Sequence, residues 1–440
     1  MARTSSAQTG AIPREVYILS GMAIVVSLGF GIISPAIPLL AKQFGVGHAV
    51  AGLAISAFAL ARFVSAYGNG KLVEKLGERP LMIWGLGIQA VMMVIAGLAP
   101  NYAIVIVCRA IAGLGSAAFS VSSLSMVLRL AQPQSRGRAA SIYQGGFLIG
   151  AVAGPAIGGV MTEVTPRLPF VAYGVCLALA GVVAVALLPR RLEARETPER
   201  FADPVLGEHA EEGQGIHYPV TVEAGHAHDQ PQPLGLASRA FLAAMAINLG
   251  NGWMLYGVRN ALVPAYVTDE LNHSATWAGG AFFLASLVQV AVLIKAGRLT
   301  DSWGRKPGMV IGATATLIAS IVLVFPPQMG AFLLAMASLG LAAAFMSSAP
   351  AAVVGDVAQA DGGRGIALFT MASDFGAVVG PILAGWLVDR YSYPAAFLSC
   401  VVVLAFSTVC CLIMQETKPP GPGAAAQAKA GQLVGRRKVR

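Results

Sequence analysis

The sequence predicts an all-α membrane protein with twelve transmembrane helices in two pseudo-symmetric six-helix bundles. Two observations predict this fold: apolar runs recur along the chain, and one charged pattern occurs twice, 227 residues apart. Of the 440 residues, 56% are apolar and 12% are charged, against about a quarter charged in soluble proteins. Each run of roughly 18 to 27 residues crosses a hydrocarbon core of about 30 Å. The predicted helices span 16–40, 49–68, 80–98, 102–128, 138–162, 169–188, 239–266, 276–296, 308–325, 330–354, 366–388 and 393–415.

The positive residues lie mainly at the termini and in the loops of one side of the predicted membrane. The exceptions are Lys42, Arg167 and Arg390 in loops of the opposite side and Arg62, Arg109 and Arg259 inside helices. By the positive-inside rule, the side rich in Lys and Arg is cytoplasmic. We therefore expect a multi-pass protein of the cell membrane with both termini in the cytoplasm. The net charge of +9 then indicates a membrane rather than nucleic acid.

A long hydrophilic stretch divides the predicted helices six and six. It is rich in Pro, Glu, Gly and His, as linkers and disordered segments are. The histidines of this stretch leave a metal-sensing role open, but without fixed ligand spacing we expect a solvated linker and no metal or cofactor. We expect a cytoplasmic tail over 1–15, a first bundle over 16–188, the linker over 189–238, a second bundle over 239–415 and a basic tail over 416–440.

The charged pattern marks an internal repeat. With an offset of 227, GKLVEKLGERP at 70–80 falls on GRLTDSWGRKP at 297–307. Two such repeats form a common transporter plan, in which the halves rock around a central site. In each turn the acid, Glu74 or Asp301, can face a helix N-terminus of the other bundle and latch one state; a plain topology marker is the alternative. The predicted gating residues are Gly70, Glu74, Gly77, Arg79, Gly297, Asp301, Gly304, Arg305 and Lys306.

The repeated turn resembles the loop signature G-x-L-x-D-x-x-G-R-K/R of the major facilitator superfamily, with Glu74 in place of Asp in the first copy. CRAIAGLGSA at 108–117 is similar to the fourth-helix signature of that family. GAVAGPAIGG at 150–159 resembles the fifth-helix element associated with its antiporters. The resemblance covers nearly the whole chain apart from the termini and the linker. It implies the family's fold and secondary transport, with export favoured over import, as in the 12-helix drug:proton antiporter branch.

The fifth-helix element also has a direct physical reading. Gly150, Gly154 and Gly158 repeat every four residues and predict a smooth face for close helix contact, and Gly159 follows them. Pro155 removes a backbone donor and bends the helix. A packing face of the kind found in any polytopic protein is the alternative to a specific antiporter role.

Two charges inside helices are the candidates for proton coupling. Arg109 lies well inside the fourth helix, and the resemblance implicates it in proton coupling or substrate contact; a structural ion pair is the alternative. Asp374 is the only acid clearly within a predicted membrane helix, where a carboxylate can load and release a proton. A purely structural acid is an equal alternative. The first helix carries no acid, although many exporters that resemble this chain have one there.

The seventh predicted helix is the most polar and supplies most of the predicted substrate cavity. Its Arg259 can attract an anionic or zwitterionic substrate or can reach the lipid headgroups. The predicted cavity residues are Asn248, Asn251, Trp253, Tyr256, Arg259, Tyr143, Phe147 and Gln289.

No GxxxxGK[ST] phosphate loop occurs, so ATP is not expected to drive the cycle. We expect a monomeric, proton-driven exporter of small hydrophobic or amphiphilic compounds, whose partners are the substrate, protons and the lipid bilayer, with no nucleic acid. The alternatives are uptake or exchange of a small organic anion or metabolite, and a membrane sensor that does not transport. A membrane enzyme is not expected, because no acid, His or Cys cluster shares one depth.

Overall fold

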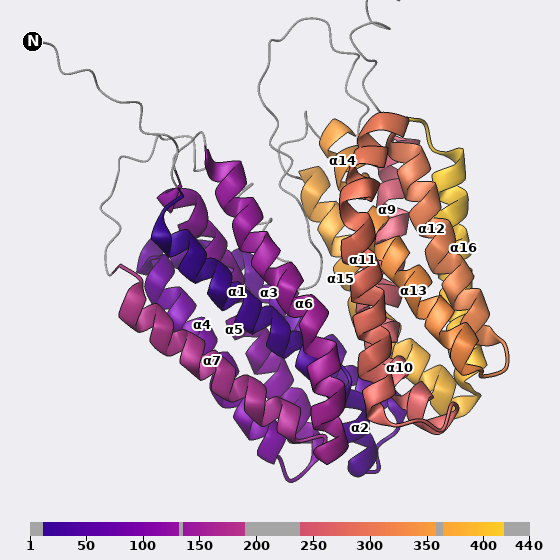
Figure 1. Cartoon of the computed structure of the whole chain (residues 1–440), viewed down its shortest axis with the longest axis horizontal. Helices are drawn as coiled ribbons and strands as arrows, with labels where there is room; N and C mark the ends of the chain where they lie inside the picture. The colour runs from indigo at the N-terminus through magenta and orange to yellow at the C-terminus, as the bar shows by residue number, and fades with distance from the viewer. Residues whose placement is uncertain (1–11, 132–134, 190–237, 358–363, 418–440) are drawn as a thin grey trace, which may run out of the picture.

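The computed structural model describes residues 12–131, 135–189, 238–357 and 364–417, and the regular structure in these ranges is helical (Figure 1). The described chain contains 12 spans that are long and apolar enough to cross a membrane. This result confirms the predicted all-α fold and the number of spans.

The first half of the chain supplies α1 (Arg14–Ile33), α2 (Ala36–Gln43), α3 (His48–Leu76), α4 (Glu78–Leu98), α5 (Tyr102–Leu130), α6 (Arg136–Val164) and α7 (Leu168–Leu187). The second half supplies α9 (Arg239–Asn251), the π-helix η3 (Gly252–Val258), α10 (Arg259–Asp269), α11 (Ala275–Trp303), α12 (Arg305–Val324), α13 (Met329–Met346), α14 (Ala349–Val357), α15 (Arg364–Arg390) and α16 (Tyr393–Ile413).

Two predicted helices are longer than expected. The prediction that the whole charged pattern forms a turn is therefore wrong, because most of each copy is helical. The second helix continues to Leu76 instead of 68, and the eighth continues to Trp303 instead of 296. In these two segments the helical backbone ends at Gly77 and Gly304. Their φ angles are 85° and 125°, values that glycine adopts without strain. Of the predicted gating loops, the segments that contain Gly70 and Gly297 are therefore helical.

Three predicted single helices are interrupted. The first breaks at Ser34 and Pro35 between α1 and α2, because proline lacks the backbone donor that would continue the helix. The seventh widens into η3, a π-helical segment of the kind often found at functional sites. The tenth breaks at Ser347 and Ser348 between α13 and α14. The breaks after α1 and around η3 fall near equivalent repeat positions.

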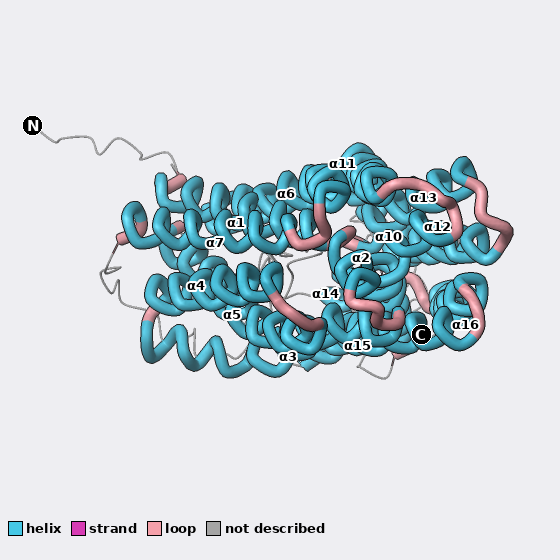
Figure 2. Tube along the Cα trace, turned by 90° about the horizontal axis from the view of Figure 1, so that it is seen from below, coloured by secondary structure: helices cyan, strands magenta, loops and turns pink. Residues whose placement is uncertain are grey.

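The two halves meet mainly through equivalent helices of the repeat. In each half, the second span packs against the fifth span of the other half, so α3 contacts α15 and α11 contacts α6. Figure 1 shows the halves joined at the end that carries α2 and α10 and diverging toward the other end. Figure 2, the view from below, shows α2 and α10 side by side between the halves. We call these the closed end and the linker end, since residues 189 and 238 lie at the second.

The outer faces of the helices are apolar, as a membrane solvent requires. Large hydrophobic side chains stay exposed along several spans, among them Val64, Trp84, Leu98 and Leu334. In a hydrocarbon environment these side chains lose nothing by facing outward, and helices satisfy their own backbone hydrogen bonds.

Candidate functional site

Small residues bring α6 of the first half against α11 of the second at the closed end. A side chain added at Gly159 would lie 2.9 Å from the Gly279 Cα atom, and one added at Gly279 would lie 2.8 Å from the Gly159 Cα atom. The carbonyl of Pro155 fills the space next to Gly279. Backbone therefore meets backbone here, which only glycine permits.

The equivalent contact joins α3 and α15. A side chain at Gly52 would lie 2.6 Å from the carbonyl oxygen of Pro381, and one at Gly385 would meet the backbone of His48. Ser56 donates a 2.6 Å hydrogen bond to the Val378 carbonyl across the same contact. The two helix pairs thus form a matched seam between the halves.

The predicted antiporter element builds one side of this seam. Added side chains at Gly150, Gly154 and Gly158 would clash with successive carbonyls of α1, those of Ile24, Leu28 and Ile32. The fourth glycine, Gly159, faces the other half instead. The element therefore fixes α1 to α6 on one face and forms the contact with α11 on another.

A cluster of polar residues ties the halves together at the closed end. Lys42 at the end of α2 pairs with Asp269 at the end of α10. His48 at the start of α3 lies with its Nδ1 atom 2.8 Å from Asp389 and its Nε2 atom 3.6 Å from Asp269. Tyr393 donates a 2.8 Å hydrogen bond to Asp269, and its hydroxyl lies 2.9 Å from His48. We call Lys42, His48, Asp269, Asp389 and Tyr393 the closed-end cluster.

The sequence analysis missed this cluster, although the repeat contains a signal for it. Lys42 and Asp269 are equivalent positions, 227 apart, and Ser34 and Asn260, which share a 3.1 Å hydrogen bond, are 226 apart. A residue near a two-fold axis meets its own copy in the other repeat. Complementary side chains at equivalent positions of the two halves therefore mark the axis.

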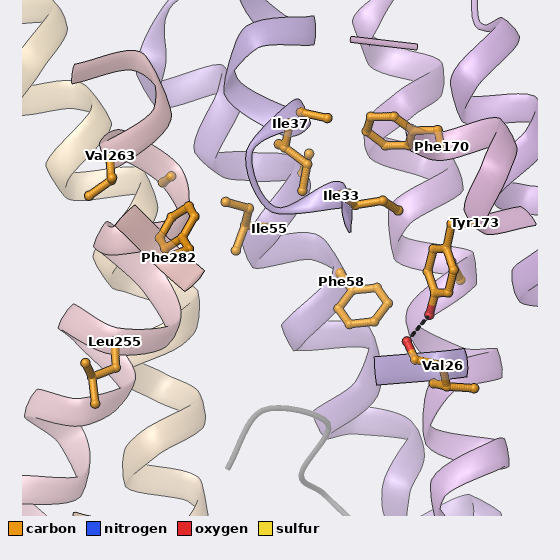
Figure 3. Close-up of a cluster of buried hydrophobic side chains, with 14 of the residues drawn as sticks. Val26, Ile33, Ile37, Ile55, Phe58, Phe170, Tyr173, Leu255, Val263 and Phe282 are labelled. Carbon is orange, nitrogen blue, oxygen red and sulfur yellow. Dashed lines mark hydrogen bonds between the residues drawn. The ribbon is translucent and has the colours of Figure 1, made fainter. Parts of the chain in front are cut away.

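A cavity lies at the seam and has Arg109 in its wall. It is lined by Phe30, Ile33, Ser34, Ile37, Ile55, Arg109 and Asn260. Figure 3 shows Ile33, Ile37, Ile55 and Phe58 of the first half and Phe282 of the second half in one apolar cluster. The Ser34 to Asn260 hydrogen bond crosses between the halves at the cavity wall.

Arg109 is buried, with 2% of its surface exposed. Its guanidinium lies 4.1 Å from the centroid of the Phe58 ring, and its Nε atom donates a long 3.4 Å hydrogen bond to the Ala54 carbonyl. No carboxylate pairs with it among the described residues. An arginine in a membrane helix costs about 2.5–3.5 kcal/mol on insertion scales, so a position without a carboxylate partner needs another explanation.

The second arginine of the predicted site, Arg259, begins α10. Its guanidinium lies 5.4 Å from the Phe282 ring centroid, and its buried Nε atom has no hydrogen-bond partner among the described residues. The neighbouring Asn260 lines the cavity and donates a 3.0 Å hydrogen bond to the Tyr256 carbonyl. The π-helical turn before α10 therefore positions Tyr256, Arg259 and Asn260 together.

Asp374 does not meet Arg109 in this state. It lies on α15, partly buried, within electrostatic range of the Tyr256 hydroxyl. The charged and hydroxyl groups that act on Arg109 are instead Tyr173, Tyr102 and Arg62. The two residues predicted to couple protons thus occupy different halves and different surroundings, and their role stays a prediction.

Of the remaining predicted cavity residues, Tyr143, Phe147 and Asn248 make contacts within their own halves. Tyr143 is buried, shares a hydrogen bond with Ser123, and stacks edge-on against Phe147 at 5.3 Å. Asn248 donates a 2.7 Å hydrogen bond to the Phe369 carbonyl, which ties α9 to α15. Asn251 and Trp253 are buried and Gln289 is partly exposed, and their place in a substrate cavity stays a prediction.

The linker end carries a charge pair in each half, and the two pairs have opposite polarity. Glu78 at the start of α4 pairs with Arg129 of α5 at 2.6 Å, whereas Arg305 at the start of α12 pairs with Asp356 of α14 at 3.2 Å. Position 78 corresponds to 305 and position 129 to 356. The repeat has kept the ion pair while exchanging its charges.

The start of α12 is capped from within its own half. Glu416 accepts hydrogen bonds from the backbone N–H groups of Arg305 at 2.8 Å and Lys306 at 3.1 Å. At the equivalent turn, Arg79 donates to the Val185 carbonyl of α7. The side chains of Glu74 and Asp301 lie outside the described part of the structure, so the predicted latch to the opposite half stays a prediction.

No group of three or more potential metal ligands occurs in the described ranges. The linker histidines that left a metal-sensing role open, His209, His217, His226 and His228, lie outside these ranges.

Comparison with known proteins identifies the family. The family model described as Major Facilitator Superfamily matches residues 19–258 and 240–440. The quinolone resistance protein NorA of Staphylococcus aureus (strain Mu50) is 25% identical over 179 residues, which is 40% of this chain and 45% of NorA. The uncharacterized MFS-type transporter YceJ of Bacillus subtilis (strain 168) is 25% identical over 175 residues, with the same coverage. The chain thus aligns with less than half the length of these curated relatives.

Two solved structures share the fold over almost the whole chain. A bacterial homolog of the human lysosomal transporter Spinster, in an inward-facing and unoccupied conformation, superimposes with a TM-score of 0.71 at 14% identity, covering 92% of this chain and 97% of that one. The human organic anion transporter MFSD10 superimposes with a TM-score of 0.59 at 18% identity, covering 91% and 100%. With twelve spans, a duplicated bundle and a family match along most of its length, this chain belongs to the Major Facilitator Superfamily of membrane transporters.

Proposed function

We propose that this transporter is a proton-coupled exporter of small hydrophobic or amphiphilic compounds. One observation carries the proposal: the halves meet at a seam of small residues beside a cavity, and the ion pairs that join them among the described residues lie on the closed-end side of that cavity. Such a seam can part as a unit, because its contacts are backbone surfaces and a few exchangeable polar pairs. The limited similarity to NorA supports export as the direction.

On this proposal the linker end faces the cytoplasm and the closed end faces outward. The state described here then opens toward the cytoplasm, where an exporter loads its substrate. To release the substrate, α3 and α11 would part from α15 and α6 at the closed end and approach the opposite half at the linker end. The positive charge of the linker-side loops supports this orientation.

Asp374 is the proposed proton carrier. Among the described spans it is the only acid far from both ends, it is partly buried, and it lies near Tyr256 in the half opposite Arg109. A carboxylate that takes up a proton from outside and releases it inside would couple the outward movement of substrate to the proton gradient.

Transport by purified protein in liposomes tests the proposal. An imposed pH gradient should drive accumulation of a lipophilic cation or an amphiphilic anion, and Asp374→Asn should abolish accumulation while downhill flux continues. Glu270→Gln, which removes an exposed acid at the closed end, serves as the matched control. Exchange of anions that ignores the gradient would favour the uptake or exchange alternative, and the absence of any flux would favour a sensor.

A further inference from the structure

The cavity at the seam carries a positive charge that the protein itself does not neutralise. The two terminal nitrogens of Arg109 donate no hydrogen bond to a protein acceptor among the described residues, although the side chain is 2% exposed. The hydroxyls of Tyr102 and Tyr173, which lie within electrostatic range, donate to the carbonyls of Ala51 and Val26 instead. The N–H groups at the edge of this guanidinium are therefore available to a ligand.

The surroundings of Arg109 add positive charge rather than negative. Arg62 lies within electrostatic range and shares the Phe58 ring with it, at 5.8 Å from the ring centroid. On the other side of the seam, Arg259 follows the π-helical turn and has a buried Nε atom without a hydrogen-bond partner in the described chain. Asp374, the acid within a span, lies within electrostatic range of Tyr256 but not of Arg109. A cation entering this cavity would meet like charge, whereas an anion would complete an ion pair.

The rest of the cavity wall is apolar. Phe30, Ile33, Ile37 and Ile55 line it, together with the hydrogen-bonded pair Ser34 and Asn260. These walls suit the hydrophobic body of an amphiphilic ligand.

We propose that this cavity binds a small amphiphilic monoanion, with its carboxylate on the guanidinium of Arg109 and its apolar body against the isoleucines and Phe30. Carboxylates match the planar donor pattern of arginine and form two parallel charge-assisted hydrogen bonds. The inference names the substrate class of the proposed exporter and rests on that function for transport, although binding can be measured separately.

Three probes of one shape and different charge test the proposal on the purified full-length protein: 2-naphthoate, 2-naphthamide and 2-naphthylmethylammonium. Calorimetric titration of the wild type should show naphthoate binding at least about 10-fold more tightly than the amide, with the ammonium weakest. Arg109→Gln should remove the preference for naphthoate while amide binding is retained, and Arg109→Lys should keep part of it. Arg390→Gln, which removes an exposed positive charge, should behave as the wild type.

Several results would overturn the inference. They are naphthoate binding no tighter than the amide, no binding of any probe, or a naphthoate preference that survives in Arg109→Gln. If Arg109→Gln fails to melt cooperatively, the ranking of probes by the wild type and Arg109→Lys still decides. Flux separates this inference from the proposed function: gradient-driven export of the ammonium but not of naphthoate would overturn the inference alone. Arg109-dependent naphthoate binding without gradient-driven flux of any probe would overturn the function alone.

Discussion

The seam between α6 and α11 allows a single methyl group to bias the two halves. In Gly279→Ala the new carbon would lie 2.8 Å from the Gly159 Cα atom and 3.0 Å from the Gly159 nitrogen. Ordinary carbon contacts lie at about 3.5–4.0 Å, so the backbones must separate by roughly 1 Å. Overpacking of this kind costs about 1–3 kcal/mol, and this cost falls only on the state in which the closed end is shut. The population should therefore shift about 5- to 150-fold toward the state open at that end.

The neighbouring glycine provides the control. A side chain added at Gly280 meets nothing within 4 Å, so Gly280→Ala changes helix propensity equally without touching the other half. Asn101 and Gln328 are exposed at the closed end of different halves. Spin labels at these two positions report the distance between the halves by double electron–electron resonance. We expect Gly279→Ala to lengthen the distance and Gly280→Ala to leave it unchanged. Equal distributions in both variants would refute the packing argument.

Three further predictions follow from contacts within and between the halves. Glu78→Arg should lower the melting temperature, because it places two positive charges together. The double variant Glu78→Arg with Arg129→Glu should restore it, because it copies the polarity of the pair in the second half; a double variant no more stable than the single one would contradict this. Asp269→Asn weakens the contacts with Lys42, His48 and Tyr393 and should lengthen the closed-end distance between spin labels, whereas an unchanged distance would show that the cluster does not hold this end. Gly154→Ala should destabilise the protein by about 1–3 kcal/mol in thermal unfolding, while Gly145→Ala, in open space, should not; similar melting of the two would remove the argument for the glycine face.

The spans could be predicted from the sequence because hydropathy and helix length respond to the same membrane thickness. The ends of the second and eighth helices could not, since hydropathy falls where the helix enters water, whereas the backbone continues until Gly77 and Gly304. The π-helix at Gly252 lies where the backbone of α15 at Ser373 approaches closely, a contact between helices that the local sequence does not contain.

The candidate site was predictable only in part. The position of Arg109 well inside a predicted helix agrees with the burial of its side chain. Tyr143, predicted to line the cavity, is buried in its own half, because an aromatic residue in a bundle has many partners besides a substrate. The closed-end cluster was missed because charges at helix ends, such as Lys42 and Asp269, also mark topology.

Alternating access is the central claim of this account, and paired distances at both ends test it most directly. Labels at Leu76 and Trp303, exposed at the ends of α3 and α11, report the linker end alongside the Asn101 and Gln328 pair. In Gly279→Ala the closed-end distance should lengthen while the linker-end distance shortens. Distances that lengthen together, or a linker end that does not respond, would contradict a rocking motion of the two halves around the seam.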